Sequence, residues 1–74
     1  MTGMMKRIDT CRPLPYSPLI PAMQAICQAE KGEILEIVLN DASAFSDLKE
    51  YLSEQGIGFR EIYDRDHMTL QFTL

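Results

Sequence analysis

A chain of 74 residues has room for one hydrophobic core, so the sequence predicts a single domain over residues 1–74 and excludes a multidomain architecture. With 46% hydrophobic and 24% charged residues, the composition is typical of a globular protein and not of a disordered or disulfide-rich chain. The net charge of -4 opposes binding to nucleic acid and to anionic membrane surfaces, and neither partner is expected.

The N-terminal residues 1–5 are expected to be disordered, and they lack an apolar run long enough for a signal peptide or a membrane span. The two cysteines, Cys11 and Cys27, are too few to form a disulfide framework and are expected to be free thiols. Both features favour a cytoplasmic location.

The first predicted elements are a short strand and a helix. The strand spans residues 6–11 around Ile8 and ends at a segment, residues 12–21, that holds all four prolines. Ser17 followed by Pro18 is typical of a helix N-terminus, so a helix is predicted to start near Ser17. Its predicted apolar stripe is Leu19, Met23, Ile26 and Cys27. This stripe places Cys27 in the core.

The second half of the chain predicts a strand, a helix and a hairpin. Lys31-Gly32 ends the first helix, and residues 33–40 form a leucine-rich strand with one fully apolar face. Asn40-Asp41 caps a second helix, and strands over 59–63 and 68–74 are joined by a polar turn. The β-α-β-α-β-β order predicts an α/β (α+β) two-layer sandwich, a four-stranded mixed sheet with both helices on one face.

Several residues along these predicted strands and helices have the spacing found in a known family. They are Asp9 at the end of the first strand, Pro18 as the second proline of a Cys-Pro-x-Pro signature, Gly32-Glu33 with Leu35, Asn40-Asp41, Asp47-Leu48 and Gly56. From Ile8 onward the chain resembles the TusA/SirA-like family of bacterial sulfur-carrier proteins. The resemblance implies a sulfur carrier or sulfurtransferase that docks on larger proteins. We expect no cofactor and no metal.

The sequence departs from this family at the residue that carries sulfur. The family's cysteine corresponds to Pro15, the first proline of its signature to Tyr16, and a glycine upstream to Arg12. The usual persulfide mechanism is therefore not expected, and whether the chain is an enzyme stays open.

Cys11 is the candidate replacement nucleophile. It lies four residues before Pro15, and the neighbouring Arg12 would favour its thiolate. The alternative interpretation is a small, half-buried residue at a strand end.

The segment with Arg12, Pro13, Pro15, Tyr16 and Pro18 is stiff and partly apolar, which suits a protein-binding loop, although a rigid connector explains it equally well. His67 fits a hairpin turn.

The chain is thus predicted to be a sulfur-handling protein or, alternatively, a non-catalytic binding or regulatory module. A weak homodimer through the open face of the sheet is a third expectation.

Overall fold

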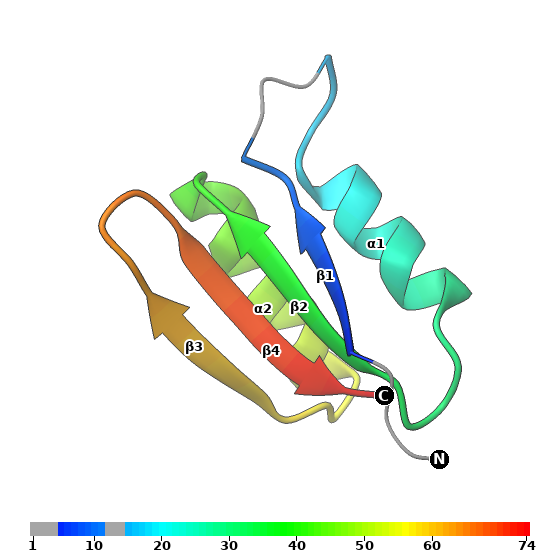
Figure 1. The fold of residues 1–74 in the computed structure, drawn as a ribbon. Helices are drawn as coiled ribbons and strands as arrows, with labels where there is room; N and C mark the ends of the chain where they lie inside the picture. The colour runs from blue at the N-terminus through cyan, green and yellow to red at the C-terminus, as the bar shows by residue number, and fades with distance from the viewer. Residues whose placement is uncertain (1–4, 12–14) are drawn as a thin grey trace.

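The computed structural model describes residues 5–11 and 15–74, which form two helices and four strands (Figure 1). The elements are β1 (Met5–Asp9), α1 (Leu19–Gln28), β2 (Ile34–Leu39), α2 (Ala42–Glu54), β3 (Phe59–Tyr63) and β4 (Met68–Thr73). The predicted order and fold class are confirmed. Met5, expected to lie in a disordered segment, is the first residue of β1, while residues 1–4 lie outside the described part of the chain.

The four strands form one mixed sheet in the order β1-β2-β4-β3. β1 and β2 are parallel neighbours, and α1 supplies the crossover that a parallel pair requires. β4 runs antiparallel to both β2 and β3. It follows that β1, β2 and β3 all end at the same edge of the sheet, which we call the carboxyl edge.

The core lies between the sheet and the two helices. In β2, Leu35, Ile37 and Leu39 are fully buried, and their partners in β4 are Phe72, Leu70 and Met68. Both helices contribute to the same cluster, which also contains Ala22, Ala25, Ala44, Phe45, Leu48 and Leu52. The period of two in β2 and β4 therefore places one face of each strand against the helices, as the sequence pattern predicts.

The opposite face of the sheet is polar in its middle row. Arg7 of β1, Glu36 of β2 and Gln71 of β4 are register partners. The guanidinium of Arg7 lies 3.3 Å from the carboxylate of Glu36, and the Gln71 amide donates to the same carboxylate at 3.0 Å. Val38 on this face is only 2% exposed, so the chain itself covers it. The side chain of Arg7 in this row is 57% exposed and that of Glu36 is 16% exposed, and the homodimer through the sheet stays a prediction.

The second helix begins and ends as its sequence predicts. The side chain of Asp41 accepts hydrogen bonds from the N–H groups of Ser43 and Ala44, which caps the first turn of α2. At the other end, Gly56 has a φ of 73°, a conformation that glycine adopts without steric cost. The N–H of Ile57 then donates back to the carbonyl of Leu52 at 2.9 Å.

The first helix is shorter than predicted at both ends. Pro18 is its N-cap residue, and Ser17 lies one position earlier, where its Oγ accepts the N–H of Leu19 at 3.2 Å. The helix ends at Gln28 because Ala29 has an extended backbone, with a ψ of 149°. Pro21 is tolerated because it lies in the first turn, where no intrahelical N–H donor is required.

Candidate functional site

The candidate site lies at the carboxyl edge, where the segments that follow β1 and β2 come together (Figure 1). Asp9 ends β1 and Cys11 lies two residues later, while Asn40 and Asp41 lie between β2 and α2. The amide Nδ2 of Asn40 donates to the carbonyl oxygen of Cys11 at 3.2 Å. This hydrogen bond joins two segments that are far apart in the sequence.

Thr10 anchors the start of the loop that follows β1. Its N–H and its Oγ1 both donate to the carbonyl of Val38, at 2.9 Å and 2.7 Å. The residue is 2% exposed, so these bonds are shielded from water and fix the backbone next to Cys11.

Among the described residues, the carboxylate of Asp9 affects Cys11 more than the charge of Arg7 does. The N–H of Cys11 donates to Oδ1 of Asp9 at 2.8 Å, which closes a tight turn around the side chain of Asp9. Burial raises the pKa of the Cys11 thiol, and a hydrogen bond between the thiol and the Asp9 side chain and the charge of Asp9 raise it further. Arg7 opposes this effect without overcoming it. Cys11 is half-buried, and its raised pKa favours the thiol over the thiolate, which would be the reactive species.

The predicted partner-binding loop is described in part. Pro15 and Tyr16 are exposed, with Tyr16 at 49%, and Pro18 is half-buried against the start of α1. Arg12 and Pro13 lie outside the described residues, so the proposed help of Arg12 to a Cys11 thiolate stays a prediction. Pro15, at the family's cysteine position, stands four residues before α1 begins.

The prediction that Cys27 belongs to the core is wrong, because its side chain is exposed. The residues of α1 that are buried are Ala22 and Ala25, which lie on the other side of the helix from Cys27. The buried side of α1 could have been predicted from these two alanines, because small residues three positions apart share one side of a helix and let it approach a sheet closely. Cys27 instead lies at the border of the apolar stripe, next to solvent.

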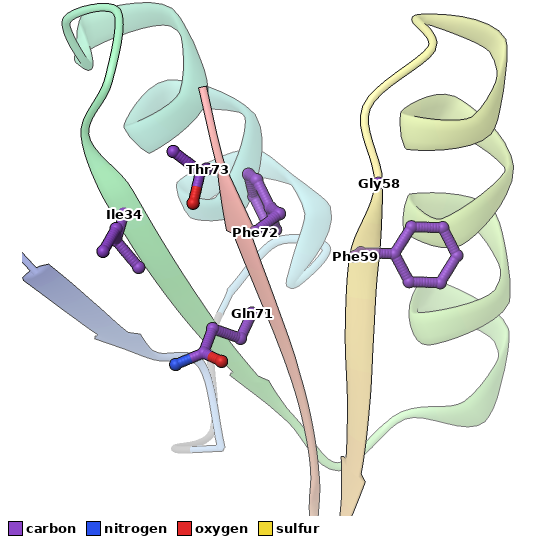
Figure 2. A pocket seen from close by; sticks show the side chains of 6 residues that line it. All are labelled: Ile34, Gly58, Phe59, Gln71, Phe72 and Thr73. Atoms are coloured by element: carbon purple, nitrogen blue, oxygen red, sulfur yellow. The ribbon is translucent and has the colours of Figure 1, made fainter.

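Two shallow hollows lie away from Cys11. One of about 330 Å³ is lined by Ile34, Gly58, Phe59, Gln71, Phe72 and Thr73, which come from β2, β3, β4 and the residue before β3 (Figure 2). Its polar side chains are an amide and a hydroxyl, so it holds no group able to act as an acid, base or nucleophile near neutral pH. The other hollow, of about 380 Å³, lies along α1 and includes Cys27.

Metal binding and membrane insertion find no basis in the described residues. In the ranges 5–11 and 15–74, no three His, Cys, Asp or Glu side chains are grouped to hold a metal ion. No helix in those same ranges is long and apolar enough to cross a membrane. His67 pairs with Asp64 at 3.1 Å within the hairpin turn between β3 and β4, the structural role that the sequence predicts for it.

Comparison with known proteins identifies the family. In comparisons with curated proteins and with solved structures, the chain has no significant match. A family model described as Sulfurtransferase TusA matches residues 6–74, nearly the whole chain, and the predicted resemblance is confirmed. The chain therefore belongs to the TusA sulfurtransferase family and to its class of small sulfur carriers.

Proposed function

We propose that this chain is a member of the sulfur-carrier family that acts by docking on a larger protein, without the family's usual persulfide cysteine. Proteins of the TusA family interact with protein partners, so a docking role agrees with the family. The observation that carries the proposal is the setting of Cys11, which is half-buried with its N–H donating to Asp9. Burial and Asp9 raise the pKa of this cysteine, the one nearest to the Pro15 position, which is the opposite of what a sulfur-accepting thiol needs.

The surface that we assign to docking is the loop with Pro15, Tyr16 and Pro18, together with Arg12 and Pro13 of the same segment. A proline-rich segment loses little conformational entropy when it is bound, and the exposed tyrosine supplies apolar area with a polar end. To test this, a photo-crosslinking residue is placed at Tyr16 and, as a matched control, at the exposed Asp66 of the hairpin. A discrete protein adduct from position 16 alone is expected, and equal labelling from both positions contradicts the assignment.

The loss of persulfide formation is tested by placing a cysteine at the Pro15 position. Pro15→Cys is made in a chain that also carries Cys11→Ser and Cys27→Ser, and it is incubated with glutathione persulfide. If only the nucleophile has been lost, this variant gains the mass of one sulfur atom. Ser17→Cys in the same background is the matched control, because it adds an exposed thiol two residues away. Sulfur uptake by the unmodified chain as fast as by Pro15→Cys contradicts the proposal.

Sulfur transfer through Cys11 is the second candidate function. It is favoured by the position of Cys11 on the same loop and by the partial access of solvent to its thiol. In that reaction the Cys11 thiolate attacks the outer sulfur of a donor persulfide, a new S–S bond forms, and the donor leaves as a thiolate. The docked partner would have to remove the effect of Asp9 on the pKa of Cys11, because the thiolate is the attacking species.

A cytoplasmic location completes the proposal. Both cysteines are free thiols in the structure, which suits a reducing compartment. Fractionation of cells that express a tagged chain tests the location, and recovery in a membrane or extracellular fraction contradicts it.

A further inference from the structure

The hollow of about 330 Å³ lies on the open face of the sheet, the face opposite to the helices (Figure 2). Ile34 is the first residue of β2 and Thr73 is the last of β4, so the hollow lies at the edge opposite to the carboxyl edge. Ile34 is half-buried, while Thr73 and Gly58 are exposed. The hollow is therefore separate from Cys11 and from the loop around Pro15.

Gly58 keeps one side of this hollow open. Its φ lies outside the left-handed region that Gly32 and Gly56 occupy, so its backbone does not require glycine. A Cβ at this position would meet no atom within 4 Å, so close packing does not require glycine either. Glycine weakens a strand compared with a β-branched residue, and it often marks a place where a ligand or another backbone approaches closely. The space in front of Gly58 is thus available to a ligand.

The apolar part of this surface continues from the hollow onto β1. Met5 is the register partner of Ile34, and it is 56% exposed. The flexible side chain of methionine adapts to apolar groups of different shape. An apolar side chain placed over Ile34 would leave water together with part of Met5, which favours its binding.

Arg60 is an unpaired cation beside the hollow. It lies two residues after Gly58 and thus on the same face of the sheet, and its register partner Gln71 lines the hollow. On this face Arg7 lies 3.3 Å from Glu36, whereas Arg60 has no carboxylate partner among the described residues. A guanidinium offers N–H donors in a planar fork that matches a carboxylate. The charge beside the hollow therefore favours a ligand that carries a carboxylate.

We propose that this hollow binds the carboxyl-terminal residue of a partner protein, with its apolar side chain over Ile34 and Gly58 and its carboxylate on Arg60. Positions two residues apart in a strand are separated by about 7 Å, so one terminal residue reaches both the apolar surface and the cation. Capture of a chain end by its carboxylate is an established mode of peptide recognition. This inference does not depend on sulfur chemistry or on the proposed docking loop.

The net charge of -4 does not prevent this contact. At physiological salt, charges more than about 8 Å from the ligand are largely screened. The carboxylate on the same face, Glu36, is paired with Arg7 and accepts a hydrogen bond from Gln71. The local charge at Arg60 therefore decides the sign of the ligand.

Amide NMR titration of the unmodified chain with three peptides tests the proposal. Acetyl-Ala-Ala-Leu with a free carboxylate should give saturable shifts at Ile34, Gly58 and Thr73, with a Kd in the millimolar range that suits so small a ligand. The same peptide with a terminal amide should bind at least roughly threefold more weakly, because it offers Arg60 no charge. Acetyl-Ala-Ala-Ala should also bind more weakly, because it lacks the larger apolar side chain.

Three variants, each shown to be folded by circular dichroism, separate the charge from the space. Arg60→Gln should weaken binding of the leucine peptide by at least roughly threefold. Arg65→Gln is the matched control, because it removes the same charge from the exposed hairpin turn and should leave binding unchanged. Gly58→Val introduces a Cβ that meets no atom within 4 Å, fills part of the hollow, and should abolish the shifts.

Four results overturn the proposal. They are shifts that do not saturate, equal affinity for the free acid and the amide, equal affinity of Arg60→Gln and Arg65→Gln, and full binding by Gly58→Val. A dilution series without peptide is the remaining control. If it shifts Ile34, Gly58 and Thr73, a second copy of the chain occupies the hollow, and the proposal is overturned as well.

Discussion

The carboxylate of Asp41 holds the first turn of α2, and its removal is expected to weaken the whole domain. Its Oδ1 accepts the N–H of Ser43 at 2.9 Å and that of Ala44 at 3.1 Å, two donors that have no partner within the helix. Replacing such a cap by alanine costs about 1 kcal/mol. A core of this size leaves only ~3–5 kcal/mol of net stability. Asp41→Ala should therefore remove a substantial part of it and lower Tm by about 4–8 °C.

Urea unfolding followed by circular dichroism measures this loss against two matched variants. Asp41→Asn keeps an acceptor oxygen and should retain most of the free energy of unfolding. Asp47→Ala removes the same charge from an exposed position of the same helix and should change that free energy by no more than about 0.5 kcal/mol. Equal free energies of unfolding for Asp41→Ala and Asp47→Ala would refute the capping role.

Further predictions concern the core, the Cys11 site and the edge strand. Leu48→Ala empties a fully buried position, so a loss of about 2–5 kcal/mol should leave much of the chain unfolded by circular dichroism. Asp9→Asn keeps an acceptor oxygen but removes the charge that raises the pKa of Cys11, so alkylation of Cys11 at neutral pH should become faster. An unchanged rate would show that burial alone controls the thiol. The hydroxyl of Tyr63 donates to Glu61 and lowers the pKa of that carboxyl, so Tyr63→Phe should raise the midpoint of the Glu61 NMR titration.

The Glu61 contact also has a defined pH window. Because the folded-state pKa of Glu61 is lowered, its contribution to stability is present above the pKa of the unfolded chain and is lost as pH falls through the folded-state value. The pKa of Tyr63 is raised by its hydrogen bond to Glu61, so its contribution is present below the unfolded pKa and is lost as pH rises through the folded value. Both groups are at the surface, and Tyr63→Phe should abolish the Tyr63 effect and reduce the Glu61 effect, of which the contribution of Lys49 remains.

The fold could be predicted because its signals are local and agree with one another. Met68, Leu70 and Phe72 alternate with polar residues, and the structure places all three on the helix side of β4. Asp41 and Gly56 bound α2 through contacts within a few residues. Such patterns fix element type and order, which together leave few ways to cover the sheet.

The exposed side of α1 and the Cys11 site depend on contacts that the sequence pattern does not show. The stripe through Leu19, Met23 and Cys27 is apolar, but close packing against the sheet selects Ala22 and Ala25 as the buried side of α1. Hydrophobicity alone therefore placed Cys27 on the wrong side. The amide of Asn40 reaches the Cys11 carbonyl from another segment, and no spacing rule predicts that bond.

The effect of Asp9 on the pKa of Cys11 could have been predicted from the sequence. Aspartate often accepts the N–H two residues further on, and Asp9 stands two residues before Cys11. The neighbouring charge of Arg12 led instead to the expectation of a stabilised thiolate. The structure indicates that, among the described residues, a carboxylate with a direct hydrogen bond and partial burial outweighs the charge of Arg7.

Intact mass spectrometry after incubation with glutathione persulfide tests the central claim most directly. The unmodified chain, Cys11→Ser and Cys27→Ser are compared at neutral pH, with circular dichroism showing that each is folded. The account predicts no stable sulfur adduct that depends on Cys11, because burial and Asp9 raise the pKa of that thiol. An adduct of one sulfur atom that persists in Cys27→Ser and disappears in Cys11→Ser would contradict it and make Cys11 a relocated carrier cysteine.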